Sequence, residues 1–195
     1  AEVPFITNEA FFDPRPQPKS VVIVGAGPIG CELGEAMARF GAQVTIVEFA
    51  DRILSRYEPD ASVLVEASMV RLGIDVRTST IAQSVRHNDG RFSVDLGAES
   101  IECDEVLVAT GRTPNTRGFG LDEAGVGLDR QGFIQTDDYL RTNVKGVFAV
   151  GDCNGIQMLS HAADEMGRLA AWTALRMGRK YKFDPNRIPH VVFTT

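Results

Sequence analysis

Three glycines in the pattern GxGxxG are the residues of this sequence whose spacing most directly indicates chemistry. Gly25, Gly27 and Gly30 follow a nearly continuous apolar run and open a segment with helical spacing. At such a turn the first glycine permits a tight bend, the second leaves room for a pyrophosphate, and the third lets the helix pack closely on the strand. Free backbone N–H groups and the positive end of the helix dipole would then face the phosphates. The pattern therefore predicts a dinucleotide site, in which Pro28 and Ile29 form the first helical turn.

An acidic residue about 20 positions further along completes this motif. Glu48 ends a second predicted strand, residues 43–48, where its carboxylate could accept hydrogen bonds from both ribose hydroxyls of an adenosine. The same carboxylate would repel a 2′-phosphate, and Arg52 nearby could partly offset that repulsion. The sequence thus favours NAD over NADP. The alternative is a glycine-rich turn that binds nothing, with Glu48 on a solvated surface.

The elements that must position these residues follow an α/β pattern. Continuous β-branched or apolar runs predict strands of a parallel sheet at 19–24, 43–48, 74–77 and 105–109. Apolar residues at helical spacing predict helices at 31–40, 59–72 and 161–177. Short alternating runs separated by turn residues predict an antiparallel meander at 81–85, 91–96 and 101–103. Further short strands are expected at 147–150 and 191–195.

Composition and charge limit the classes of function. The chain has 195 residues, of which 44% are hydrophobic and 24% are charged, as in ordinary globular proteins. The formal net charge of −6 disfavours a nucleic-acid partner, which usually meets a basic face. No apolar run approaches the roughly 20 residues that span a bilayer, so the sequence predicts no membrane partner.

The three cysteines, Cys31, Cys103 and Cys153, are widely spaced and form neither a CxxC motif nor a metal-type cluster. A disulfide scaffold and a metal site are therefore not expected, and a reducing cytoplasm is the default location. Cys31 and Cys103 are interpreted as small buried thiols. Cys153 has no partner thiol in the sequence pattern, so we do not expect it to exchange disulfides.

Four stretches of the sequence together resemble a known family: VVIVGAGPIGCELGEAMARFGAQVTIVE, VLVATGRTPNT, VFAVGDC and IPHVVFTT. Over nearly its whole length the chain resembles the class I FAD-dependent pyridine nucleotide–disulfide oxidoreductases. That family includes dihydrolipoyl dehydrogenase, glutathione reductase, mercuric reductase and soluble transhydrogenase. The stretches FITNEAFF and GPIGCEL look most like the mercuric-reductase branch. The choice between a mercuric-reductase-like and a dihydrolipoyl-dehydrogenase-like protein stays open.

The resemblance implies a three-part enzyme. A Rossmann-like, three-layer NAD(P) domain, with a parallel sheet and an antiparallel meander, is inserted into an FAD domain, and a dimerisation domain follows. Residues 1–17 would leave the FAD domain, 18–141 would form the NAD(P)-binding domain, 142–184 would return to the FAD domain and 185–195 would begin the dimerisation domain. The chain would then be the central part of a longer cytoplasmic homodimer, and the rest of its own polypeptide would be a partner. Apolar surface is expected around 147–150 and on the 161–177 helix.

The resemblance also implies roles toward NAD for individual residues. The pyrophosphate loop is matched by Gly25, Gly27, Pro28, Ile29 and Gly30, and the adenosine-ribose ligand by Glu48. Glu32 matches a glutamate near the nicotinamide that pairs with an FAD-domain lysine outside this chain, and it is the one residue to which a catalytic role is carried over. Ile81 matches a backbone contact to adenine, and Gly111 lies near the nicotinamide end.

A second group of residues matches the family's flavin motif. Gly151 and Asp152 match the flavin turn, with the aspartate on the ribityl hydroxyls. The stretch beside the isoalloxazine ring is matched by Met158, Leu159, Ser160 and His161. This stretch opens a helix whose positive end suits a reduced, anionic flavin. No acid–base role is assigned to His161, which is expected to be structural.

In the whole family enzyme, NAD(P)H passes hydride to FAD, and a dithiol/disulfide pair then exchanges electrons with the substrate, a function in cell redox homeostasis. This chain shows no second GxGxxG, no redox cysteine pair and no C-terminal His–Glu pair. We therefore expect it to bind NAD without turning over a substrate by itself. The alternative from a different class is a standalone dinucleotide-binding module without redox activity.

Overall fold

The structure, a computed structural model, describes residues 3–175 and 181–194. The chain divides into two compact units, residues 1–111 together with 191–195, and residues 112–190. Each unit has a buried core of its own, and all the named β-strands belong to the first unit. The two units are therefore described separately.

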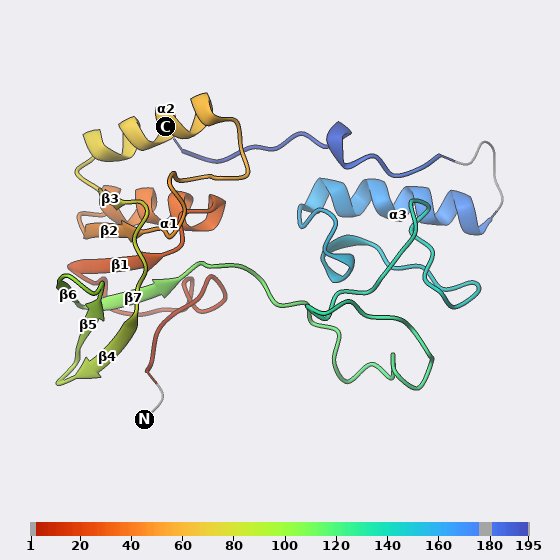
Figure 1. The fold of residues 1–195 in the computed structure, drawn as a ribbon, viewed down its shortest axis with the longest axis horizontal. Coiled ribbons are helices and arrows are strands. Elements are labelled where there is room, and N and C mark those ends of the chain that lie inside the picture. Colours follow the sequence, from red (N-terminus) through yellow and green to blue (C-terminus); the bar gives the residue numbers. More distant parts are fainter. Residues whose placement is uncertain (1–2, 176–180, 195) are drawn as a thin grey trace. The chain divides into compact units, whose positions relative to one another are not determined.

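A four-stranded parallel sheet forms the centre of the first unit, in the order β3-β2-β1-β7 (Figure 1). Its strands are β1 (Ser20–Val24), β2 (Gln43–Val47), β3 (Asp75–Arg77) and β7 (Glu105–Val108). β1 pairs in parallel with both β2 and β7, which agrees with its β-branched run, typical of a strand buried on both faces. The predicted parallel sheet is confirmed.

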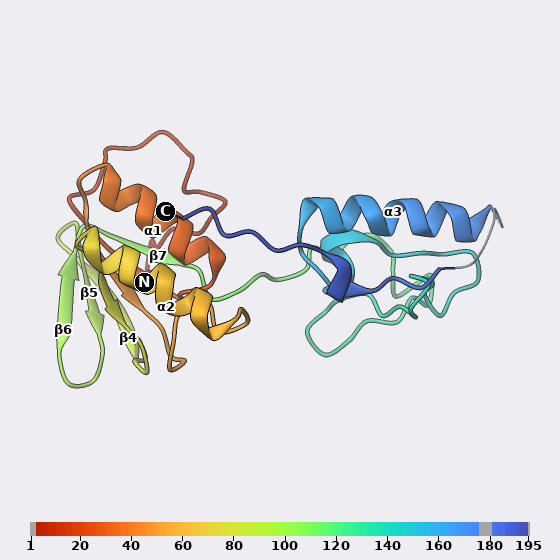
Figure 2. The ribbon, with the colours of Figure 1, turned by 90° about the horizontal axis from the view of Figure 1, so that it is seen from above.

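Two layers cover the two faces of this sheet, one helical and one made of the antiparallel strands (Figures 1 and 2). Successive side chains of a strand point to opposite faces. On the helical side, Val21 and Ile23 of β1 share a buried cluster with Met69. On the other side, Val22 shares a cluster with Phe92 of the antiparallel sheet. The chain thus has the predicted mixed α/β fold with two sheets.

Helices α1 (Pro28–Arg39) and α2 (Pro59–Arg71) form the helical layer. Each begins with a proline, whose fixed φ and missing N–H suit the first turn of a helix. Each is followed within two residues by a glycine with positive φ, Gly41 at 91° and Gly73 at 83°. Both helix ends therefore lie where the glycines predict them.

The antiparallel sheet consists of β4 (Ser84–Asn88), β5 (Arg91–Asp95) and β6 (Ser100–Cys103), in that order. The β4–β5 turn contains Asp89 and Gly90 with φ of 52° and 77°, and two positive φ angles are what a type I′ hairpin requires. The predicted meander is confirmed, although β4 begins at Ser84 rather than Ile81. Thr80 donates its N–H to the carbonyl of Glu48, so the segment after β3 still runs beside the end of β2 before the hairpin starts.

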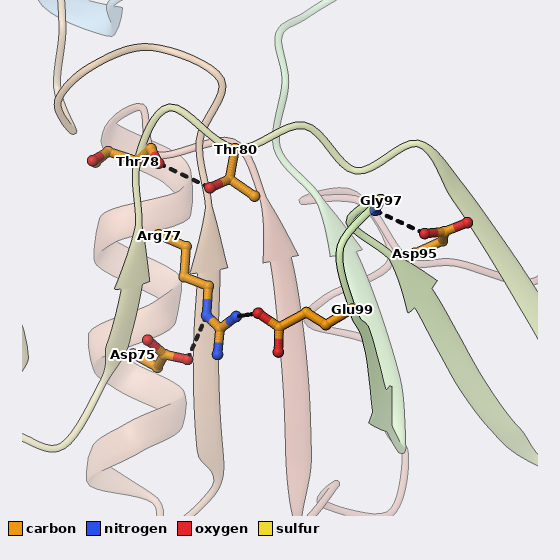
Figure 3. Close-up of polar contacts among 7 residues, drawn as sticks. All are labelled: Asp75, Arg77, Thr78, Thr80, Asp95, Gly97 and Glu99. Atoms are coloured by element: carbon orange, nitrogen blue, oxygen red, sulfur yellow. Dashed lines mark hydrogen bonds and ion pairs between the residues drawn. The ribbon is translucent and has the colours of Figure 1, made fainter.

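Arg77, the last residue of β3, connects the parallel sheet to the antiparallel one (Figure 3). Its guanidinium donates to Asp75 Oδ2 at 2.8 Å and also to the carboxylate of Glu99, just before β6. The hydrogen bond to Asp75, followed by the one to Glu99, raises the pKa of Arg77. In the same view the N–H of Gly97 donates to Asp95 Oδ1 at 2.8 Å, which closes the β5–β6 turn.

The second unit is built around α3 (Ser160–Ala174), with the short 3-10 turns η1 (Gly151–Asn154) and η2 (Pro185–Arg187). Its core joins the helix to loops on both sides of it in the sequence, with the buried residues Leu140, Ala162, Met166, Leu169, Ala170 and Phe183. Asp138 accepts hydrogen bonds from Lys182 Nζ and from the N–H of Phe183, both at 2.8 Å. These contacts place Asp138 in the second unit together with residues 182–183.

Two predicted strands do not form in the described part of the chain. Residues 147–150 make a single antiparallel bridge, from Phe148 to Arg141, and residues 191–194 make none; Thr195 lies outside the described residues. Two backbone hydrogen bonds, Thr142 N–H to Val147 and Ala149 N–H to Leu140, flank that bridge, so the pairing is too short to form a strand. The apolar residues are buried all the same, since Ala149 is buried and Val192 packs against the core of the first unit. The predicted 161–177 helix is confirmed as far as Ala174, and residues 176–177 are outside the described range. Val147, Trp172 and Leu175 are exposed, in agreement with the expected apolar surface.

Candidate dinucleotide-binding site

The three glycines of the loop between β1 and α1 are required for different reasons. Gly25 has a φ of 103°, and a Cβ on it would lie 2.7 Å from the carbonyl oxygen of Ala109. A Cβ on Gly30 would lie 2.0 Å from the carbonyl oxygen of Gly25, so the helix packs directly on the loop. A Cβ on Gly27, by contrast, would meet nothing within 4 Å. The first and third glycines thus serve the fold, and the second faces open space that a ligand could fill.

The start of α1 leaves backbone donors free beside that space. Pro28 has no N–H, and the first bonded amide of the helix is that of Cys31, which donates to the carbonyl of Gly27 at 3.0 Å. The N–H groups of Gly27, Ile29 and Gly30 have no acceptor among residues 3–175 and 181–194. Together with the helix dipole, such free donors form an anion-binding end.

Glu48 follows β2 at the same edge of the sheet and is only 8% exposed. Its Oε2 accepts the N–H of Ala26 at 2.7 Å, and its Oε1 accepts the N–H of Ala50 at 2.9 Å. Each carboxylate oxygen keeps a further lone pair for another donor. The sequence placed Glu48 correctly at the strand end, but it gave no signal that the side chain would hold the glycine loop through Ala26.

Arg52, which the sequence suggested could offset the negative charge of Glu48, instead forms hydrogen bonds within its own loop. Its guanidinium donates to the carbonyl oxygens of Leu54, Ser55 and Tyr57 at 3.2, 2.8 and 3.1 Å. Three carbonyl acceptors orient the planar group toward its own loop. The residue therefore stabilises the turn that leads into α2.

The segment predicted to contact adenine lies next to Glu48. Ser79 donates its N–H to the carbonyl of Ala50 at 2.7 Å, and Thr80 donates to the carbonyl of Glu48 at 2.9 Å. Ile81, which follows directly, is 64% exposed. Phe49, between Glu48 and Ala50, is 79% exposed and was not identified from the sequence. Two apolar side chains are therefore available at this end of the sheet.

Gly111 is the last residue of the first unit and has a φ of 150°. It follows β7, whose continuation at Ala109 donates its N–H to the carbonyl of Val24 at 2.8 Å. The carbonyl of Ala109 in turn abuts Gly25. Ala109, two residues before Gly111, therefore lies against the glycine loop.

Glu32, the predicted nicotinamide residue, lies on α1 just after the free amides. Its Oε1 accepts the N–H of Phe193 at 3.0 Å, a contact between residues 161 positions apart. Val192 packs against the same core. Residues 192–193 therefore lie beside Glu32 in the first unit.

The flavin-type residues lie together in the second unit. Gly151 opens η1 with a φ of 78°, and a Cβ on it would lie 3.2 Å from Ala163 Cβ of α3. The carboxylate of Asp152 is largely exposed and accepts a hydrogen bond from Arg112 Nη1 at 3.0 Å. Arg112 also donates to the carbonyl of Met158. Arg112 is a residue of the matched TGRTPN stretch to which sequence reasoning gave no role.

Helix α3 begins at Ser160, immediately after Leu159. Its first bonded amide is that of Ala163, which donates to the carbonyl of Leu159 at 2.9 Å. In the described part of the chain the N–H groups of Ser160 and His161 have no acceptor, which leaves a second anion-binding end. His161 Nε2 donates to the carbonyl of Pro189 at 2.7 Å, which agrees with a structural function of the ring.

Comparison with known proteins identifies the family. Residues 2–167 match the family described as pyridine nucleotide-disulphide oxidoreductase. The chain belongs to this family. The prediction of a class I pyridine nucleotide–disulfide oxidoreductase is confirmed, and with it membership of a flavin-dependent oxidoreductase family.

Curated proteins that are similar to this chain include dihydrolipoyl dehydrogenases. The protein from Mycobacterium tuberculosis is 37% identical over 192 residues, which cover 96% of this chain and 41% of the relative. The protein from Geobacillus stearothermophilus is 36% identical over 181 residues, which cover 91% of this chain and 38% of the relative. The chain thus spans about two fifths of the length of these relatives.

Two solved structures share the fold of this chain. LpdA from Mycobacterium tuberculosis superposes with a TM-score of 0.89 at 29% identity, over 97% of this chain and 41% of that one. The HOCl-induced flavoprotein disulfide reductase RclA from Escherichia coli gives a TM-score of 0.88 over 97% of this chain and 44% of that one, at 24% identity. Across the described residues, none of the helices has the length and apolar character needed to cross a membrane.

The cysteines of this family member are not poised as nucleophiles. Burial raises the pKa of Cys31 to about 12, with Glu48 and Glu32 adding to the effect. Burial likewise raises the pKa of Cys103 to about 11. Cys153 is partly buried, which raises its pKa, and its Sγ donates to the carbonyl of Val150 at 3.3 Å. The interpretation of Cys31 and Cys103 as buried thiols is confirmed.

Proposed function

We propose that the first unit is the NAD(H)-binding part of an FAD-dependent disulfide oxidoreductase. The observation that carries this proposal is the pairing of the open glycine loop with Glu48 at one edge of the sheet. The free amides and the empty space at Gly27 suit a pyrophosphate. The remaining lone pairs of Glu48 suit ribose hydroxyls, and the hydrogen bond from Ala26 holds the two features together.

The bound dinucleotide would supply the hydride, and this chain would bind and orient it. The residues proposed to hold NAD(H) are Gly25, Gly27, Pro28, Ile29, Gly30, Glu48, Ile81 and Gly111. Glu32 would lie nearest the nicotinamide. The N–H of Phe193 fixes its Oε1, which leaves Oε2 as the acceptor available in that position. Its role would be to orient the dinucleotide rather than to transfer a proton.

We infer a preference for NAD over NADP from the charge at Glu48. A 2′-phosphate would bring a further negative group to a buried carboxylate that two backbone amides already fix in place. Arg52 offers little compensation because its guanidinium already donates to three carbonyl oxygens of its own loop. The cofactor of the first unit would therefore be NAD, with NADP disfavoured.

The second unit would contribute part of an FAD site. The backbone of η1 passes close to α3 at Gly151, so a side chain at this position would displace Ala163. Asp152 presents an exposed carboxylate, which suits the hydroxyls of a ribityl chain. Met158 and Leu159 lead into the free amides of Ser160 and His161, which suit the anionic end of a reduced flavin.

The whole protein would be a longer cytoplasmic homodimer that contains this chain. In it, the NAD domain would include residues 18–111, the part of the predicted range 18–141 that lies in the first unit, and 1–17 and 142–184 would belong to the FAD domain. The relatives of about 37% identity favour a dihydrolipoyl-dehydrogenase-like protein over a mercuric-reductase-like one. The class of substrate would then be a small dithiol or disulfide, acted on by parts of the protein outside this chain.

Titration of this chain with NADH and with NADPH tests the proposal. We expect NADH to bind at least about tenfold more tightly, measured by the change in nicotinamide fluorescence. Tighter binding of NADPH would overturn the role of Glu48. The second candidate function, a standalone module, predicts that the protein expressed from its complete gene carries no flavin. A stoichiometric flavin spectrum in that protein would exclude it.

A further inference from the structure

Arg112 joins both ends of the proposed flavin-binding segment. Its Nη1 donates to Asp152 Oδ2 at 3.0 Å and to the carbonyl oxygen of Met158 at 3.3 Å. Asp152 lies in η1, and Met158 lies two residues before α3. A single guanidinium nitrogen therefore spans the loop between the two elements.

The loop that Arg112 closes is ordered by its own contacts as well. Asn154 is buried, and its Nδ2 donates to the carbonyl of Ala149 at 3.1 Å. Its Oδ1 accepts the N–H of Ile156 at 3.1 Å. These bonds fix the middle of the loop, but they do not touch the carboxylate of Asp152. Among the described residues, Arg112 is the group that fixes that carboxylate.

The hydrogen bond also determines which oxygen of Asp152 remains available. Oδ2 is held by the guanidinium, and Oδ1 has no donor among the residues that the structure describes. A charge-assisted hydrogen bond to one oxygen restricts rotation of the carboxylate. Oδ1 is thereby left in a defined direction, which is what recognition of a hydroxyl group needs.

We propose that Arg112 is a positioning residue, which orients Asp152 and the start of α3 for the flavin. This inference rests on the proposed FAD site in the second unit. The side chain of Arg112 is 39% exposed and that of Asp152 57% exposed, so the pair contributes little to folding. The effect of the pair is to orient the carboxylate of Asp152.

The test uses the protein expressed from its complete gene, as apoprotein and after reconstitution with FAD. The variants are Arg112→Gln, which removes the charge, and Arg112→Lys, which keeps it. Arg117→Gln is the matched control, because Arg117 is an exposed arginine of the same loop with no ion pair in the described part of the chain. The readouts are the dissociation constant for FAD, the visible spectrum of the bound flavin and the melting temperature of the apoprotein.

We expect Arg112→Gln to weaken FAD binding at least tenfold and to shift the flavin spectrum, while the apoprotein melts at the wild-type temperature. Arg112→Lys should recover part of the affinity, and Arg117→Gln should behave as wild type. Wild-type affinity and spectrum in Arg112→Gln would overturn the inference and leave the FAD site intact. A wild-type protein that binds no FAD would instead overturn the proposed function on which the inference rests.

Discussion

The backbone N–H of Ala26 donates to Glu48 Oε2 at 2.7 Å, so the glycine loop and the acidic residue at the end of β2 form one hydrogen-bonded unit. The two parts of the motif are usually considered separately, one for phosphate and one for ribose. Here a change at Glu48 would also release the loop. Binding and stability are therefore expected to change together at this residue.

The substitution Glu48→Gln should lower both the free energy of unfolding and the affinity for NADH. The amide presents an NH₂ group to one of two backbone donors, so either Ala26 or Ala50 loses its acceptor. A buried donor left without a partner costs about 1–3 kcal/mol in the free energy of unfolding. NADH affinity should fall roughly tenfold or more. Urea unfolding and NADH titration measure the two effects, with the exposed Glu123→Gln as control. Unchanged stability would show that the bond to Ala26 contributes nothing.

Gly27→Ala and Gly30→Ala should separate ligand binding from folding. A Cβ on Gly27 meets nothing within 4 Å, so the variant should lose less than about 1 kcal/mol of stability and yet bind NADH poorly. A Cβ on Gly30 would lie 2.0 Å from the carbonyl oxygen of Gly25, so that variant should lose on the order of 2–4 kcal/mol. Thermal unfolding and NADH titration of both variants make the comparison. Normal NADH binding by Gly27→Ala would contradict the placement of the pyrophosphate.

Cys31 should make the stability of the first unit sensitive to alkaline pH. Burial raises its pKa from 9.0 to about 12, so the folded state holds the proton after the unfolded chain has lost it. The unfolded state binds fewer protons between these values, and stability therefore falls as the pH rises through that range. The loss at pH 10 is about 1.4 kcal/mol relative to pH 8. Urea unfolding at both pH values should show a smaller loss in Cys31→Ala. An equal loss of stability between pH 8 and pH 10 in the variant and the wild type would show that groups other than Cys31 cause the pH dependence.

Arg77 should contribute a modest, salt-sensitive amount to the attachment of the antiparallel sheet. Its ion pairs with Asp75 and Glu99 are partly exposed, so Arg77→Gln should lower the free energy of unfolding by about 1 kcal/mol or less. The difference should vanish in 1 M salt. Arg86→Gln, an exposed arginine of β4 with no ion pair in the described part of the chain, is the control. A larger, salt-independent loss would indicate a packing role for the Arg77 side chain.

The local part of the fold could be predicted because each signal lies within a few residues of its effect. The β-branched run of β1, the prolines at the start of α1 and α2, and Asp89-Gly90 in the hairpin each favour one backbone conformation. The position of Glu48 at the end of β2 could be predicted because the acidic residue of the motif directly follows the apolar run of that strand. The family could be predicted because its motifs occur in order along the chain.

The rest depends on contacts that local patterns do not encode. The N–H of Phe193 reaches Glu32 across 161 positions, and nothing near either residue signals the pairing. The apolar run at 147–150 predicted a strand, but the structure gives it one bridge and buries Ala149 instead. The partner of Asp152 is likewise 40 positions away, at Arg112. Tertiary packing determines each of these contacts, so they could not be predicted from the local sequence.

The most direct measurement of the central claim is an amide chemical-shift map of this chain titrated with NADH. The proposed site predicts that the largest shifts fall on Gly27, Ile29 and Gly30, with further shifts at Ala26 and Ala50, whose amides donate to Glu48. NADPH at the same concentration should produce smaller shifts at the same amides. Shifts that leave the glycine loop unchanged and fall elsewhere in the chain would contradict the site.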